Sequence, residues 1–225
     1  MILTIPVFYF LEITLAPLPL LFGIIATALS GRVNELVAVD FAHLSERAML
    51  YVVFTFGEMI IAITEYFEGG MEFNTIYYSL MAFLIVAGLF LSYENIYDHI
   101  LDREKQTRGT GYMLIHVFMI FALNNITTAL EFMREPEVSI VPKILFLTGS
   151  FILYYICLFL TDFYARDRLR FSPRFILLLA VIAVSFAGLM YIFRGQMYIN
   201  ISLTVIYAYG IFIMMYLYSR RDCRM

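Results

Sequence analysis

A carboxylate at position 58 stands inside a long apolar run and is the side chain of this sequence best placed to do chemistry. At about 100° per residue, one helical face of that run carries a mostly polar set: His43, Arg47, Phe54, Glu58, Ile61 and Glu65. A charged group inside a bilayer costs roughly 3 kcal/mol on insertion scales, so it needs compensation. We therefore expect this face to point into a helical bundle or into a wet cavity.

A second apolar run repeats the pattern, with Tyr112, His116, Asn124, Thr127 and Glu131 within about 120° of arc. Asn124 and Thr127 fall near the middle of the run, where hydrogen bonds to a neighbouring helix usually satisfy such groups. The two polar faces could lie opposite each other, with Glu58 and Asn124 at similar depth. We treat the nine residues His43, Glu46, Arg47, Glu58, Glu65, His116, Asn124, Thr127 and Glu131 as a candidate polar track.

Two interpretations of this track compete. In the first, Glu58 accepts a proton or binds a cation, and His116 acts as a relay because imidazole titrates near neutral pH. In the second, Arg47 pairs with Glu46 or Glu94, and Glu58 is a protonated or hydrogen-bonded packing element. Arg47 lies one turn from the predicted helix end, and its long side chain can reach the interface from there.

Enzyme and metal signatures are weak. The sequence has no H-E-x-x-H, G-x-S-x-G, P-loop or glycine-rich dinucleotide motif. His43 and Glu46 have a spacing that can bind metal, but at a helix start this pair more often forms a cap and ion-pair cluster. We predict no metal, no cofactor and no enzyme activity, while an intramembrane lipid enzyme using acid–base groups stays an alternative.

The composition requires a membrane environment to hold these residues. Of 225 residues, 62% are hydrophobic and 15% charged, and the mean hydropathy is +0.84. This excludes an ordinary soluble domain, and no basic patch suits nucleic acid. Backbone groups in lipid must bond within their own segment, and the runs are too long for barrel strands. We predict an all-α fold: a polytopic integral membrane helical bundle.

About 20 apolar residues make one crossing, which predicts seven transmembrane helices in a single domain, 1–225. The expected spans are 2–29, 44–67, 74–98, 111–133, 140–165, 174–193 and 199–218. Pro17 and Pro19 should kink or divide the first. With 17 Tyr and no Trp, tyrosines near helix ends, including Tyr93 and Tyr97, are predicted to form the interfacial belt.

The distribution of basic residues predicts the orientation. Alternate loops place 12 of the 15 Lys and Arg on one side: Arg32, Arg47, Arg103, Lys105, Arg108, Arg166, Arg168, Arg170, Arg174, Arg220, Arg221 and Arg224. Arg134, Lys143 and Arg194 fall on the other. The positive-inside rule then predicts an N-terminus outside and a C-terminus in the cytoplasm.

The run His43-Leu44-Ser45-Glu46-Arg47, followed by Leu50, Gly57-Glu58, Ile60 and Ala62, resembles the H-x-x-E-R and G-E signature of the bacterial low temperature requirement A (LtrA) family. Tyr112 and His116, and then 125–131 ahead of Pro136, are similar to a later Tyr-x-x-x-His helix of that family. Members are usually longer, with an E-L-F-F-D-L-V-F type segment that 1–12 does not reproduce. The resemblance implies a multi-pass protein of the bacterial plasma (inner) membrane, either the C-terminal part of a member or a shortened one.

Two functions follow as hypotheses. The chain moves a proton or small cation along the polar track, or it is a non-transporting scaffold or cold-adaptation protein. In the second case the basic segment 166–174 binds anionic lipid or a cytoplasmic partner. The lipid bilayer is a partner in both. The sequence does not decide the oligomeric state.

Overall fold

The computed structural model describes residues 22–23, 25–26, 39–64, 67, 72–132 and 139–221, the last without its side chain. Within this part of the chain six long helices are apolar and long enough to cross a membrane. They are α3 (Phe41–Thr64), α4 (Phe73–Asn95), α5 (Thr110–Phe132), α6 (Ile140–Leu160), α7 (Pro173–Ile192) and α8 (Met197–Arg221). The prediction of an all-helical, multi-span membrane protein is confirmed.

The predicted spans from 44 onward agree with these six helices to within a few residues at each end. The predicted first span, 2–29, lies almost entirely outside the described residues. Local capping explains several ends. Asp40 Oδ1 accepts hydrogen bonds from the backbone N–H groups of Ala42 (3.0 Å) and His43 (3.3 Å), which starts α3. Ser172 caps α7 and is followed by Pro173 at the first helical position.

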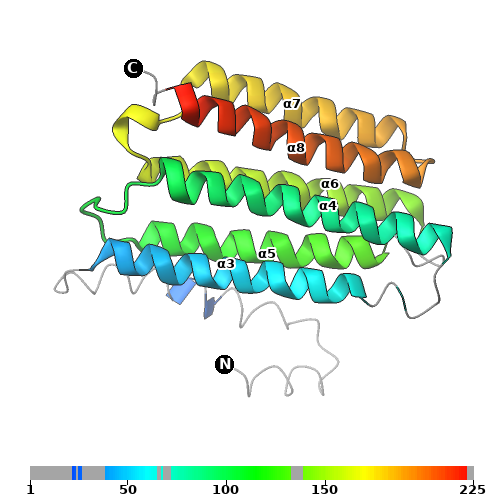
Figure 1. Cartoon of the computed structure of the whole chain (residues 1–225), viewed down its shortest axis with the longest axis horizontal. Coiled ribbons are helices and arrows are strands. Elements are labelled where there is room, and N and C mark those ends of the chain that lie inside the picture. Colours follow the sequence, from blue (N-terminus) through cyan, green and yellow to red (C-terminus); the bar gives the residue numbers. More distant parts are fainter. Residues whose placement is uncertain are drawn as a thin grey trace.

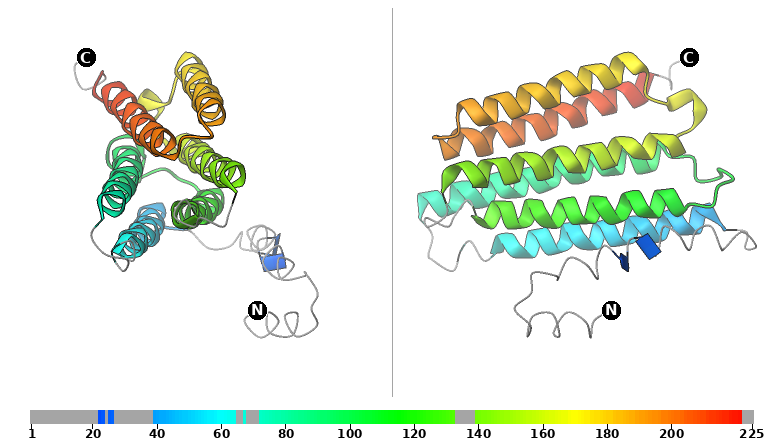
Figure 2. Two further views of the ribbon diagram at one scale, coloured as in Figure 1. Left: turned by 90° about the vertical axis from the view of Figure 1, so that its right-hand side faces the viewer. Right: turned by 180° about the vertical axis from the view of Figure 1, so that it is seen from behind.

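Seen from the side, the helices lie in three layers, which hold α7 and α8, α6 and α4, and α5 and α3 (Figure 1). The closest packing joins one layer to the next, between α5 and α6 and between α4 and α8. The end-on and rear views show the same arrangement (Figure 2). Helices that are distant in sequence are neighbours, since α4 packs along α8 and α3 packs along α5. Gly88 of α4 permits a close approach to α8, because a Cβ added there would lie 3.0 Å from Cβ of Ala208. Small residues at such contacts are typical of membrane helix packing.

Two connections are tied together at one end of the bundle. After α4, a π-helical turn (Ile96–Ile100) leads into a loop that meets the one after α6, where Leu101 and Ala165 form an isolated antiparallel bridge. Arg166 N–H donates to the Ile100 carbonyl at 3.0 Å. The short 3-10 helices η3 (Thr161–Tyr164) and η4 (Asp167–Leu169) follow in the second loop.

This end collects most of the described basic residues, as the alternation of loops predicts: Arg47, Arg103, Lys105, Arg108, Arg166, Arg168, Arg170, Arg174 and Arg220. Lys143 and Arg194 belong to the opposite end. The grouping of the loops is therefore as expected, and the side of the membrane on which they lie remains a prediction from the positive-inside rule.

Candidate functional site

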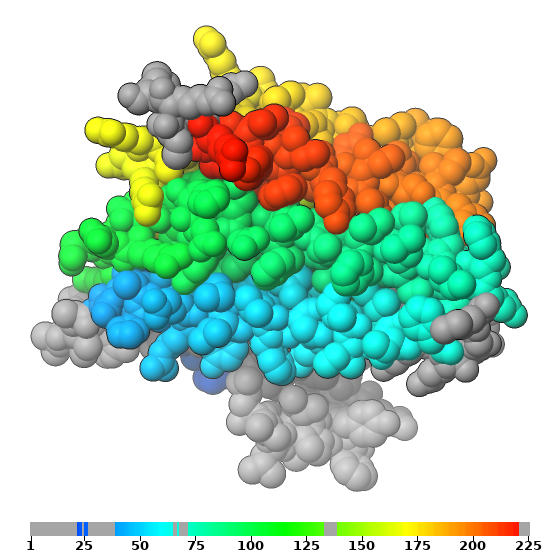
Figure 3. Space-filling model, in the orientation of Figure 1, coloured from blue at the N-terminus to red at the C-terminus, as the bar shows by residue number. Residues whose placement is uncertain are grey.

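The polar face of α3 is exposed along the outside of the bundle. His43, Glu46, Arg47 and Glu58 are all exposed, whereas Glu65 lies outside the described residues. Figure 3 shows α3, coloured blue to cyan, forming part of the surface along its length. The prediction that this face points into the bundle is thus wrong for the described helices.

Packing explains the reversal. The buried side of α3 consists of apolar and small residues: Phe41, Ser45, Ala48, Val52, Thr55, Phe56, Met59 and Ile63. These can close against α4 and α5 without burying a charge, whereas turning Glu58 inward would require a partner for its carboxylate. Glu58 also precedes the last residue of α3 by six positions, about 9 Å along the axis, which brings it nearer to water and head groups.

The polar residues of α5 differ in how far they are exposed. Asn124 is exposed, so it and Glu58 do not meet at the α3–α5 interface although the two helices are neighbours. Thr127 and Glu131 are half-buried and line a cavity of about 10 Å³ together with Met59 and Ile63 of α3. That volume holds about one water molecule. Thr127 and Glu131 are thus members of the predicted track that line one space between α5 and α3.

His116 is buried in a separate cluster near the other end of α5. Its Nδ1 lies 2.8 Å from the carbonyl oxygen of Tyr112, and its Nε2 lies 3.1 Å from the hydroxyl of Tyr93 in α4. A carbonyl can only accept, so Nδ1 carries the proton and the neutral ring accepts at Nε2 from the Tyr93 hydroxyl. Both ring nitrogens of His116 therefore have a hydrogen-bond partner, and the Tyr112 carbonyl fixes which of them carries the proton of the neutral ring.

An apolar layer separates His116 from Glu131 inside the bundle. Along α5 this layer contains Met119, Ala122, Leu123 and Ile126, all fully buried, and α5 packs against α6 and α3. The fifteen positions between the two residues correspond to about 22 Å along the helix. The described interior of α3–α5 thus holds two separate polar sites rather than one continuous track.

Ion pairing is sparse among the described residues. His43 Nδ1 and Glu46 Oε2 are 3.5 Å apart at the exposed start of α3, as the cap-and-pair interpretation expects. Arg103 pairs with Asp98 at 3.0 Å and lies over the ring of Tyr97. In the same part of the chain Arg47 has no carboxylate within 4 Å, so the expected Arg47–Glu46 or Arg47–Glu94 pair is wrong. No cluster of three metal-ligating side chains occurs in these ranges.

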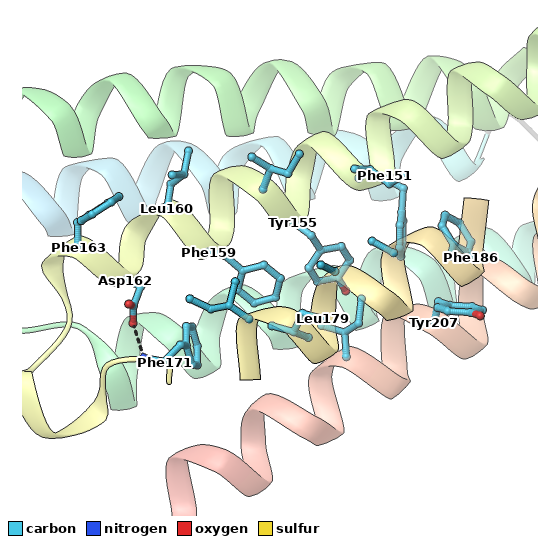
Figure 4. Close-up of a pocket in the computed structure, with 16 residues that line it drawn as sticks. Phe151, Tyr155, Phe159, Leu160, Asp162, Phe163, Phe171, Leu179, Phe186 and Tyr207 are labelled. Atoms are coloured by element: carbon cyan, nitrogen blue, oxygen red, sulfur yellow. Dashed lines mark hydrogen bonds between the residues drawn. The ribbon is translucent and has the colours of Figure 1, made fainter. Parts of the chain in front are cut away.

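A groove of about 420 Å³ lies between α6, α7 and α8. We call it the α6–α7 groove. Its lining is almost entirely apolar: Phe151, Ile152, Tyr155, Ile156, Phe159, Leu160, Asp162, Phe163, Phe171, Ile176, Leu179, Ala180, Ala183, Phe186, Tyr207 and Ile211. Figure 4 shows Tyr155 and Phe159 of α6 pointing toward Leu179 of α7. Ile156 and Ile176 are each at least half exposed, so the groove opens on the side of the bundle.

A folded connection closes one end of this groove. Asp162 Oδ1 accepts a hydrogen bond from the backbone N–H of Phe171 at 3.0 Å (Figure 4). This bond holds the Phe171 ring against Phe175 and Tyr218, with centroids 5.2 and 5.4 Å away. The Tyr218 hydroxyl donates to the Arg170 carbonyl at 2.8 Å, which ties α8 to the same connection. These hydrogen bonds and ring contacts therefore give the connection at the end of the groove a defined conformation.

Comparison with protein-family models shows the family of the chain. The model for bacterial low temperature requirement A protein (LtrA) matches residues 2–210. The chain belongs to the LtrA family. The resemblance predicted from the H-x-x-E-R and G-E residues is confirmed, and with it a multi-pass membrane protein of a bacterial family. Comparison with curated proteins and with solved structures gives no match.

In this LtrA-family chain, sequence reasoning missed the residues that surround the best-formed sites. Tyr93 and Tyr97 were assigned to an interfacial belt, but they are buried, and Tyr93 bonds to His116. The groove was missed entirely. Its only sequence signal is an aromatic ridge in α6 at Phe151, Tyr155 and Phe159, spaced four residues apart.

Proposed function

We propose that this LtrA-family chain is a non-enzymatic membrane protein that binds a membrane lipid, with an acyl chain in the α6–α7 groove. The observation that carries the proposal is the groove itself: about 420 Å³, apolar, and open sideways between two membrane-spanning helices. Ligand sites are commonly apolar cavities of this size with few polar groups. We extend the low-temperature requirement in the family's description to this chain as part of the same proposal.

The surroundings favour an acyl chain over other ligands. Within the hydrocarbon core, lipid tails are the molecules that reach an apolar opening between helices, and they match its chemistry. Helix α7 forms one wall of the groove and is weakly packed on the bundle, because only Leu179, Phe186 and Met190 are buried along its length. A wall with so few packed contacts can shift to admit a chain without breaking the core.

Filling the groove should remove the bound lipid. Ala183 lines it, so in Ala183→Trp the indole is expected to occupy the acyl-chain space and reduce the lipid retained by the purified protein at least threefold. Val184, the next residue, is 73% exposed and does not line the groove, which makes Val184→Trp the matched control. Native mass spectrometry from mild detergent measures bound phospholipid per protein. Equal retention in both variants would show that the groove holds no lipid.

Movement of a proton or small cation is a second candidate function. The observation that favours it is Glu58, an exposed carboxylate in a membrane-spanning helix, with Glu131 at a small cavity on the neighbouring α5. Because the interior between His116 and Glu131 is apolar, such a path would follow the outer surface of α3 and α5, where Glu58 and Asn124 are exposed.

Flux through proteoliposomes separates this second candidate from lipid binding. With an imposed pH gradient, transport through Glu58 predicts that Glu58→Gln abolishes proton or cation flux, because the neutral amide neither takes up a proton nor attracts a cation. Glu94→Gln removes an exposed acid from α4 and should leave flux unchanged. No flux in the wild-type chain, or the same flux in all three proteins, would exclude the Glu58 mechanism.

A further inference from the structure

We infer that the lipid in the α6–α7 groove is a phospholipid with an anionic head group, selected by a basic rim made of Lys105, Arg170 and Arg174. This inference rests on the proposed lipid-binding function and adds the chemical class of the ligand. Two observations carry it: the position of the rim at the closed end of the groove, and the excess of basic over acidic residues around it.

Two residues of the rim donate hydrogen bonds to the same backbone carbonyl, that of Phe163. Lys105 Nζ donates to the carbonyl of Phe163 at 2.7 Å, and a terminal nitrogen of Arg170 donates to the same oxygen at 3.5 Å. Phe163 itself lines the groove. Two cations from connections far apart in sequence therefore converge where the apolar lining ends. Arg174 is exposed in the first turn of α7, two residues before Ile176, which also lines the groove.

The charge balance leaves the rim free to bind an anion. The two connections that carry the rim, 101–109 and 161–174, together contain seven basic and four acidic residues. Within the described chain, none of the three rim residues has a carboxylate within 4 Å. The nearest acid, Asp162, interacts electrostatically with Arg170 and Lys105, and one of its oxygens is already bonded to Phe171 N–H. A phospholipid whose phosphate is not neutralised by a cation in its own head group would find net positive charge and unused donors here.

The geometry matches the two-part chemistry of a glycerophospholipid. Its acyl chain is apolar and its phosphate begins where the chain ends, just as the apolar groove gives way to the rim at Phe163. The rim also lies at the end of the bundle where most described basic residues gather. A free anion would use the rim alone, whereas a phospholipid uses both parts, and we commit to the phospholipid.

The test compares phosphatidylglycerol with phosphatidylcholine on the full-length chain. In mixed micelles with equal amounts of both, native mass spectrometry should find phosphatidylglycerol bound at least fivefold more often. The triple variant Lys105→Gln/Arg170→Gln/Arg174→Gln should lower this preference below twofold while the total bound lipid stays near the wild-type level. Glutamine keeps a donor and much of the side-chain length, and the Arg170 carbonyl that bonds Tyr218 is untouched.

A matched control removes charge from the same connection without touching the groove. Arg166 and Arg168 are exposed and do not line it, so Arg166→Gln/Arg168→Gln should keep the fivefold preference. An equal loss in both variants would assign the effect to general surface charge and overturn the inference. If the wild-type chain retains lipid without preference, only the head-group inference fails. If it retains no lipid, the proposed function fails with it.

Discussion

Gly88→Leu is expected to destabilise the bundle by forcing apart the contact between α4 and α8. A Cβ at position 88 would already lie 3.0 Å from Ala208 Cβ and 3.3 Å from the ring of Tyr209. The remaining atoms of leucine would have to push α4 away from α8. Overpacking of a tight contact typically costs about 1–3 kcal/mol and occasionally more. For a chain of this size, that corresponds to a melting temperature lower by roughly 4–10 °C.

Gly149→Leu is the matched control, because it also places leucine at a mid-helix glycine. A Cβ at position 149 of α6 would meet nothing within 4 Å, and the residue is exposed. This variant should stay within about 1 kcal/mol of wild type, since replacing a helical glycine removes only its intrinsic penalty. The readout is the fraction of monodisperse protein that survives heating in detergent. Equal melting temperatures for the two variants would contradict the close α4–α8 packing.

The helices were predictable because their signals are local. Apolar runs of the right length, ended by glycine, proline or a capping side chain, are present in the sequence itself. Ser172-Pro173 illustrates this: the side chain of the first residue caps α7, and the second occupies its first position. Such features act over a few residues and need no knowledge of the neighbours. The spans from 44 onward accordingly agree with the helices to within a few residues at their ends.

The direction of a helical face was not predictable in the same way. Helical periodicity correctly grouped His43, Arg47 and Glu58 on one side of α3, but it does not say which side packs. In a membrane helix both faces can be apolar, so burial follows close packing rather than hydrophobicity alone. The buried side of α3 contains Ser45, Ala48 and Thr55, small side chains that let α4 and α5 approach.

The groove and the His116 cluster depend on more than one helix, which places them beyond a single-sequence argument. The groove requires the relative positions of α6, α7 and α8, and its Asp162–Phe171 closure joins residues nine positions apart. The bond from Tyr93 to His116 joins α4 to α5. The lone histidine was recognisable as a candidate, but its partner was not, because tyrosines are frequent in this chain and only packing distinguishes a buried one.

The buried Tyr93–His116 hydrogen bond should show measurable energetic coupling. Tyr93→Phe leaves the buried Nε2 of His116 without its donor, and His116→Leu leaves the buried Tyr93 hydroxyl without the imidazole acceptor. Each loss should lower the free energy of unfolding by about 1–3 kcal/mol, the usual penalty for an unsatisfied buried group. In the double variant both polar groups are gone, so the combined loss should be smaller than the sum by about 1–2 kcal/mol.

Denaturant unfolding of the four proteins in mixed micelles gives the coupling energy directly. Tyr207→Phe is a suitable control, because the Tyr207 hydroxyl bonds to Ser185 at an exposed position, and its removal should be nearly neutral. Strictly additive losses for Tyr93 and His116 would mean that the hydroxyl and the imidazole do not depend on each other. A coupling of the expected size would instead support a neutral imidazole held by its two partners. Proton uptake by His116 would then first require the Tyr93 hydroxyl to turn away from Nε2, because that nitrogen is occupied by a donor in the folded chain.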